Sequence, residues 1–173
     1  PLYSIPRDSF MTYRGGYLYF GYFQRAGNSI LEKFKIAGTG DLKLYSSDVY
    51  QQHYEKMLPD KIAMPINVFV VDSMIQGIAF YKNTMFLTKS YGILPSKLYT
   101  FDVVTGMNDN SVYTKDTALN SYSLPQKVEQ IYISDGAIYT LYESGAYAYR
   151  LYSYPSVDRI LQIPLDILTT SEH

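Results

Sequence analysis

The stretch that decides the fold reads "IQGIAFYKNTMFLTKSYG" and runs from Ile75 to Gly92. Apolar residues occupy alternate positions on both sides of Lys82-Asn83, as with Ile78 before these two residues and Met85 after them. A period of two gives a strand one buried face, and a two-residue connection between two such runs is typical of a β-hairpin. The stretch therefore predicts two antiparallel strands joined by a tight turn.

The same plan occurs three times: a strand, a two-residue turn, a second strand, a variable loop and a third strand. The three turns are Gly15-Gly16, Lys82-Asn83 and Asp135-Gly136, and Asp-Gly is the strongest hairpin signal of the three. The third strands are expected in "ILEKFKI", "SKLYTFDV" and "DRILQIPLD". A repeated antiparallel unit of this size is typical of a β-propeller blade.

We therefore predict an all-β fold: a partial β-propeller of about three antiparallel blades with one short inserted helix. The chain of 173 residues is expected to be a single domain or half-domain, with blades at 5–45, 66–105 and 122–168 and the helix at 47–58. The helix is expected because Val49, His53 and Met57 recur at four-residue spacing, and Pro59 then ends the pattern.

Three blades do not close a ring, because propellers typically have four to eight. The sequence therefore predicts a partner that completes the open sheet edges. This partner is either a missing N-terminal half or a second copy of the chain.

Composition excludes several classes of function. Fifteen Lys and Arg against sixteen Asp and Glu leave a net charge of −1 without charged blocks, so no nucleic acid is expected as a partner. No Cys and only two His are present, so we expect that this chain alone assembles neither a histidine-rich metal site nor a Ser-His-Asp triad. Pro65 and Asn67 interrupt the longest apolar run, so no membrane span is expected. The lack of Cys favours an extracytoplasmic location: secreted, periplasmic or on the cell surface.

Aligning the units on their turns places polar residues at equivalent positions. Ser9, Gln76 and Glu129 share a position near the start of the first strand, and Phe23, Ser90 and Glu143 share one at the end of the second. An antiparallel hairpin brings both positions to the same end of the sheet. Gly92 and Gly145 follow, and we expect them to turn the chain at a crowded corner through a positive φ or a close backbone contact.

Glu129 and Glu143 are thereby expected to lie close together. Paired carboxylates do acid/base work or bind a cation. The alternative is that Glu129 is a solvated residue at the start of its strand and that Glu143 pairs with Arg150.

Three segments carry a resemblance to a known family: "SFMTYRGGYLYFGYF", "QGIAFYKNTMFLTKSYG…SKLY" and "YTLYESGAYAYR…DRIL". In this order they resemble the C-terminal half of a family of uncharacterised bacterial β-propeller-like proteins, over about Ile5 to Asp166. The resemblance implies a propeller fold and a missing N-terminal half of comparable size, and it supplies no established activity. The matching residues are Gln76, Gly77, Ser90, Tyr91, Gly92, Glu143, Ser144 and Arg150. Tyr22 is a departure, because the first blade of the family usually carries Glu there.

Tyrosine makes up 20 of the 173 residues, and aromatic faces with a few polar groups suit sugars or peptides. We therefore predict a non-catalytic ligand-binding or interaction module for a small carbohydrate or peptide ligand, without a cofactor. The expected ligand-binding residues are Gln76, Ser90, Tyr91, Glu129, Glu143, Ser144, Tyr147 and Arg150.

The alternative function is a propeller-type metal-dependent hydrolase or lyase. In that case Glu129 and Glu143 belong to an active site that the absent N-terminal half completes. Only this alternative requires a divalent cation.

Overall fold

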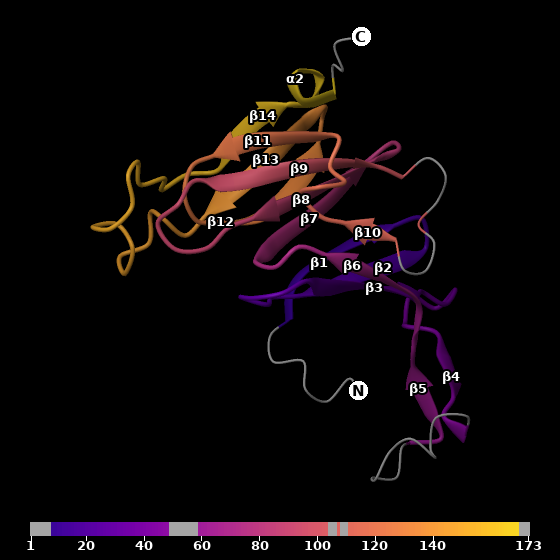
Figure 1. The fold of residues 1–173 in the computed structure, drawn as a ribbon. Coiled ribbons are helices and arrows are strands. Elements are labelled where there is room, and N and C mark those ends of the chain that lie inside the picture. Colours follow the sequence, from indigo (N-terminus) through magenta and orange to yellow (C-terminus); the bar gives the residue numbers. More distant parts are fainter. Residues whose placement is uncertain (1–7, 49–58, 104–106, 108–110, 170–173) are drawn as a thin grey trace.

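The computed structural model describes residues 8–48, 59–103, 107 and 111–169 (Figure 1). Within these ranges the chain is mostly β, and its strands form four separate sheets that do not close into a barrel. No helix in the described part of the chain has the length and apolar character needed to cross a membrane.

Three of the sheets contain three to five strands each. Across the first sheet the order is β1 (Asp8–Arg14), β2 (Tyr17–Tyr22), β3 (Ser29–Lys35), β6 (Pro65–Val71) and β10 (Val112–Tyr113). Across the second it is β11 (Asn120–Leu124), β9 (Ser96–Asp102), β8 (Thr84–Lys89) and β7 (Ile75–Tyr81). The third consists of β12 (Val128–Ser134), β13 (Ala137–Tyr142) and β14 (Leu161–Pro164), followed by the short helix α2 (Leu165–Thr169).

The three predicted hairpins are confirmed as the antiparallel pairs β1–β2, β7–β8 and β12–β13. The first turn residue is left-handed in each, with φ of +58° at Gly15, +50° at Lys82 and +48° at Asp135. Two-residue hairpin turns require this conformation because it matches the twist of the strands. A third strand then pairs with the second strand of each hairpin.

The sheet boundaries differ from the predicted blade boundaries. β6 pairs with β3 and belongs to the first sheet, although the sequence assigns residues 66–105 to the second blade. β11 likewise pairs with β9 in the second sheet, although it overlaps the start of the predicted third blade. In both cases the added strand follows a long connection, and strand periodicity does not reveal which sheet such a strand joins.

The insertion between β3 and β6 leaves and returns through a two-stranded ribbon. Its strands are β4 (Leu44–Ser46) and β5 (Lys61–Ala63), which pair antiparallel and form the fourth sheet. In Figure 1 this ribbon projects away from the other sheets. The predicted helix at 47–58 lies almost entirely on residues 49–58, which are outside the described residues.

Two hydrophobic cores lie between the sheets. Leu31 and Phe69 of the first sheet belong to one core with Met85 of the second, and Phe86 of the second belongs to the other with Ile138 of the third. The second sheet is therefore covered on both faces, and β8 has four consecutive buried residues. The strand β7 contacts both β1 and β12, so the first strands of the three sheets lie together.

Candidate functional site

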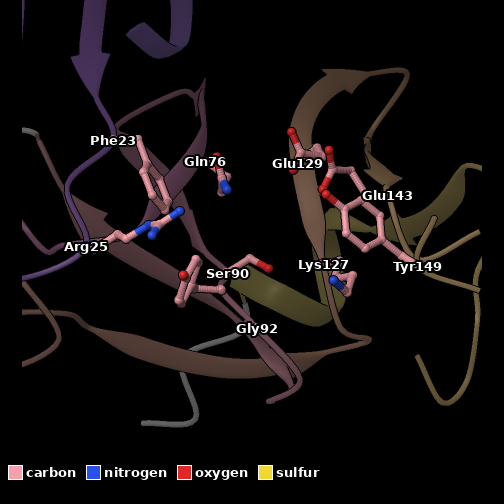
Figure 2. Close-up of a pocket in the computed structure, with 10 residues that line it drawn as sticks. Phe23, Arg25, Gln76, Ser90, Gly92, Lys127, Glu129, Glu143 and Tyr149 are labelled. Atoms are coloured by element: carbon pink, nitrogen blue, oxygen red, sulfur yellow. The ribbon is translucent and has the colours of Figure 1, made fainter. Parts of the chain in front are cut away.

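A cavity of about 550 Å³ lies at the end of the sheets where the three hairpins open. It is lined by Phe23, Arg25, Gln76, Ser90, Tyr91, Gly92, Lys127, Glu129, Glu143 and Tyr149. Figure 2 shows Gln76 on one wall and the two glutamates on the opposite wall. Five of the eight predicted ligand-binding residues are among the lining residues, and they come from two different sheets.

A β-bulge lies at the same position in the first strand of each of the three hairpins, next to the cavity. The pairing slips between Asp8 and Phe10 on β1, between Ile75 and Gly77 on β7, and between Val128 and Gln130 on β12. The extra residues are therefore Ser9, Gln76 and Glu129, the three that turn alignment makes equivalent. A bulge redirects the side chain of the extra residue, and Gln76 and Glu129 both line the cavity.

A left-handed residue precedes the bulge in the second and third sheets. Met74 and Lys127 both have φ of +61°, which is uncommon for residues other than Gly. The carbonyl of Met74 accepts a hydrogen bond from the backbone of Ser90 at 3.0 Å, and that of Lys127 accepts one from Glu143 at 2.9 Å. These bonds tie the end of the second strand to the start of the first and bring Glu143 next to Glu129.

Glu129 and Glu143 form a hydrogen-bonded carboxyl pair. Burial is the largest cause that raises the pKa of Glu129, and the charge of Glu143 and the hydrogen bond that protonated Glu129 donates to the Glu143 carboxylate raise it further, to about 7. Lys127 acts in the opposite direction. Because two ionised carboxylates repel each other and lack a donor, the pair holds a shared proton near neutral pH. Figure 2 shows the two carboxyl groups side by side.

Aromatic rings and cations form the rest of the lining. The Arg25 guanidinium lies 5.1 Å from the ring centroid of Tyr91, and the Lys127 ammonium lies 3.8 Å from that of Tyr149. The ring of Phe23 lies 6.0 Å from that of Tyr91. The cavity thus combines flat apolar surfaces with hydrogen-bond donors and a proton-sharing acid pair.

Three residues predicted as ligand-binding do not line the cavity. Ser144 is buried, and its Oγ accepts a hydrogen bond from the backbone of Val157 at 2.9 Å. Arg150 donates from Nε and Nη2 to the carbonyl of Gly145, at 3.2 and 2.9 Å, which ties down the loop after β13. Tyr147 is almost fully exposed on the same loop.

Ser90 has a structural role as well as a place on the wall. Its buried Oγ accepts a hydrogen bond from Ser96 at 2.9 Å, and the Ser96 Oγ in turn accepts one from the backbone of Val128 at 3.2 Å. The Ser96 hydroxyl therefore links Ser90 of the second sheet to the third sheet. These hydrogen bonds hold Ser90 in place at the corner of the cavity.

The predicted roles of the two glycines are confirmed. Gly92 has φ of +73°, and a Cβ at Gly145 would lie 2.4 Å from the carbonyl oxygen of Val157. Gly92 thus provides the left-handed turn, whereas Gly145 permits a close backbone approach.

Five lining residues were not among those predicted to bind a ligand: Phe23, Arg25, Gly92, Lys127 and Tyr149. Turn alignment marked Phe23 as the equivalent of Glu143, which was a usable signal. Arg25 and Tyr149 lie on irregular loops, where strand periodicity gives no register.

Metal chemistry would need ligands beyond the carboxyl pair. In the described part of the chain, no group of three or more His, Cys, Asp or Glu side chains is placed to hold a metal ion. Glu129 and Glu143 alone would supply two carboxylate ligands, fewer than Ca²⁺ or Mg²⁺ normally takes from a dedicated protein site.

Comparison with known proteins assigns no family to the chain. No family model matches it, and no curated protein matches it. Nine solved chains match. One is the crystal structure of the computationally designed Ika4 protein, with 12% identity over 91% of this chain and 90% of that chain and a TM-score of 0.38. The crystal structure of the computationally designed Ika8 protein has 13% identity, covers 80% of this chain and 43% of that chain, and has a TM-score of 0.37. Both scores are too low to support an inference, so the site is interpreted from its own geometry.

Proposed function

We propose that the chain is a propeller-type binding module whose cavity takes a small polar ligand, a carbohydrate or a short peptide. The first, second and third sheets are successive blades of this propeller. The contacts of β7 with both β1 and β12 support the blade arrangement, because the first strands of propeller blades surround a common axis.

The observation that carries the binding proposal is the carboxyl pair within an aromatic-walled cavity. A pair that shares one proton offers both a donor and several acceptors at the same place. The hydroxyl groups of a sugar need such mixed partners, and the rings of Phe23, Tyr91 and Tyr149 give its apolar face flat surfaces to pack on. The volume is within the range of about 300–1,000 Å³ that small-molecule sites have.

A screen of the whole chain against glycan and peptide arrays tests the proposal. Tyr91→Ala removes an aromatic wall and Glu143→Gln removes the shared proton, and each is expected to weaken binding of a captured ligand by about tenfold or more. Tyr147→Ala is the matched control, because this exposed tyrosine is outside the cavity. Binding that is equally strong in Tyr91→Ala and Glu143→Gln would overturn the assignment of the site.

The raised pKa of Glu129 supports a second candidate, a hydrolase or lyase completed by a further part of the protein. Glu129, whose pKa is raised, would act as the acid and Glu143 as the base, which is the division of roles that paired carboxyl groups adopt. A divalent cation belongs to this candidate only, with additional ligands from outside the cavity.

Turnover of a chromogenic glycoside and ester panel by the longer protein that the enzyme candidate requires, with and without Mg²⁺, Ca²⁺ or Mn²⁺, separates the two candidates. The enzyme candidate predicts a rate that falls as the pH rises through about 7, because the acid Glu129 then loses its proton. It also predicts that Glu129→Gln abolishes turnover. Ligand binding without turnover under every condition contradicts it and leaves the binding module.

A further inference from the structure

The face of the first sheet that points away from the second sheet is apolar, and no other sheet of the described part of the chain covers it. We call it the leading face and define it by four side chains, Met11 and Tyr13 on β1 and Leu18 and Phe20 on β2. Met11 pairs with Phe20 and Tyr13 with Leu18, so the four side chains share one face. Met11 is 56% exposed and Tyr13 is 65% exposed.

The apolar surface continues onto β3 and β6. Val68 and Ile66 of β6 are also exposed, and Glu32 of β3 pairs with both Phe20 and Val68. Glu32 itself is buried, and its carboxylate accepts a hydrogen bond from Tyr22 at 2.6 Å. The carboxylate is thus already satisfied within the sheet, and the surface around it is suited to contact with apolar side chains.

The equivalent positions of the other two sheets are buried beneath the preceding sheet. Turn alignment makes Met11 equivalent to Ile78 and Ile131, and both isoleucines are buried. Ile78 belongs to the core between the first and second sheets, and Ile131 to the core between the second and third. Leu18 is equivalent to Met85, which has no exposed surface. The leading face therefore has the pattern of a face that receives a preceding sheet.

The third sheet also has exposed apolar side chains, on the face that points away from the second sheet. We call this the trailing face and define it by Tyr132, Tyr139 and Leu141, where Tyr132 pairs with Tyr139 across the strands. Tyr132 is 67% exposed and Leu141 is 51% exposed, and the three residues line a hollow of about 490 Å³.

The equivalents of these residues in the second sheet are covered by the following sheet. Turn alignment matches Tyr132 with Ala79 and Tyr139 with Phe86, and both belong to the core between the second and third sheets. Leu141 is matched with Thr88, which is fully buried. The trailing face therefore has the pattern of a face that a following sheet covers.

We propose that a second copy of this chain covers both faces. The trailing face of each copy packs on the leading face of the other, in the way that consecutive sheets pack within the chain. A head-to-tail contact of this kind closes a ring when the rotation permits it. Two copies of three sheets give about six, within the four to eight blades of known propellers.

A second copy of the chain is the partner that fits, because one chain has both kinds of uncovered face. Each copy contributes one leading and one trailing face, so a closed pair leaves neither face uncovered. The sequence analysis expects a partner that pairs with open sheet edges, whereas this proposal places the partner on two sheet faces. This inference is independent of the ligand and would stand if the cavity bound nothing.

Light scattering of the 173-residue chain after size exclusion tests the proposal, and the expected mass is twice the 19.8 kDa of one chain. Tyr13→Glu on the leading face and Tyr132→Glu on the trailing face should each give a monomer. Leu119→Glu is the matched control, because Leu119 is 62% exposed next to the second sheet and on neither face. It should leave the dimer intact, and circular dichroism should show that all three variants are folded.

Mixing the two monomeric variants tests the head-to-tail arrangement. The Tyr13→Glu copy keeps a native trailing face and the Tyr132→Glu copy keeps a native leading face, so the mixture should recover a dimer at raised concentration. A monomeric wild-type chain overturns the proposal and assigns the leading face to another occupant, such as a preceding segment of a longer polypeptide. A dimer that persists in both variants, or a mixture that stays monomeric, also overturns it.

Discussion

Replacing Glu143 by Gln tests the carboxyl pair through the stability of the fold. In the folded chain the pKa of Glu129 is raised from 4.5 to about 7, with burial as the first cause and Glu143 as the second. A carboxyl group whose pKa is raised by folding favours the protonated form. Its contribution to stability is therefore fully present below pH 4.5 and is lost as the pH rises through 7.

The size of this effect follows from the two pKa values. Their difference corresponds to at most about 3 kcal/mol in the free energy of unfolding between pH 4.5 and 8. Glu129 is only half-buried, and solvent screening reduces the figure to about 1–2 kcal/mol. In Glu143→Gln the charge repulsion disappears while the burial remains. The pKa of Glu129 should therefore fall but stay above its ordinary value, and the loss of stability with rising pH should shrink.

Urea unfolding at pH 4.5, 6 and 8 measures this change for the wild type, Glu143→Gln and Glu129→Gln. The carboxyl of Glu32, whose pKa burial also raises, is present in all three proteins, so only the differences between them report on the pair. Asp158→Asn is the control for a carboxylate on the exposed surface. The reasoning is refuted if Glu143→Gln shows the same pH dependence as the wild type, or if Asp158→Asn shows the same reduction as Glu143→Gln.

Two further predictions concern the fold around the site. Gly145→Ala should destabilise the chain by about 1–3 kcal/mol in urea unfolding, because the new Cβ overlaps the carbonyl of Val157; Gly38→Ala, where the Cβ meets nothing within 4 Å, should not. Tyr22→Phe should lower the free energy of unfolding by about 1–3 kcal/mol, because buried Glu32 loses its hydrogen-bond donor. The loss should be larger at pH 8 than at pH 5, because this hydrogen bond lowers the pKa of Glu32. An equal loss at both pH values would contradict this.

Much of the fold was readable from the sequence because hairpins are local. Gly15-Gly16 and Asp135-Gly136 fix their turns, and alternation of apolar residues marks the two faces of a strand. Alternation does not decide which face is buried, because Met11 and Tyr13 alternate on β1 and both are exposed. The pairing of β6 with β3 and of β11 with β9 was not readable from the sequence, because these partners lie across long connections. Pairing of that kind depends on packing between distant segments, and a period of two carries no information about it.

The site was readable to the same extent. Glu129 and Glu143 were predicted to meet because both positions are counted from a turn, and the structure places them in one hydrogen-bonded pair. Arg150 and Ser144 were predicted as site residues because they match the motifs that carry the family resemblance, but the first binds the carbonyl of Gly145 and the second holds the backbone of Val157. A loop residue can satisfy its polar group locally, and sequence position does not distinguish that from a contact with a ligand.

The recurrence of the bulge explains why counting from the turn worked at the site. A bulge normally breaks register, and an extra residue in only one sheet would have moved Glu129 out of equivalence with Gln76. Here the bulge lies six positions before the turn in all three sheets. The register shift is therefore the same in each sheet, and residues counted from the turn stay equivalent. The backbone at this position is thus alike in the three sheets, while the residue that occupies it differs: Ser9 in the first sheet, Gln76 in the second and Glu129 in the third. The chemistry of this end of the molecule is therefore set by side-chain choice on a repeated backbone, and the acid pair arises only in the third sheet, where Glu occupies both equivalent positions.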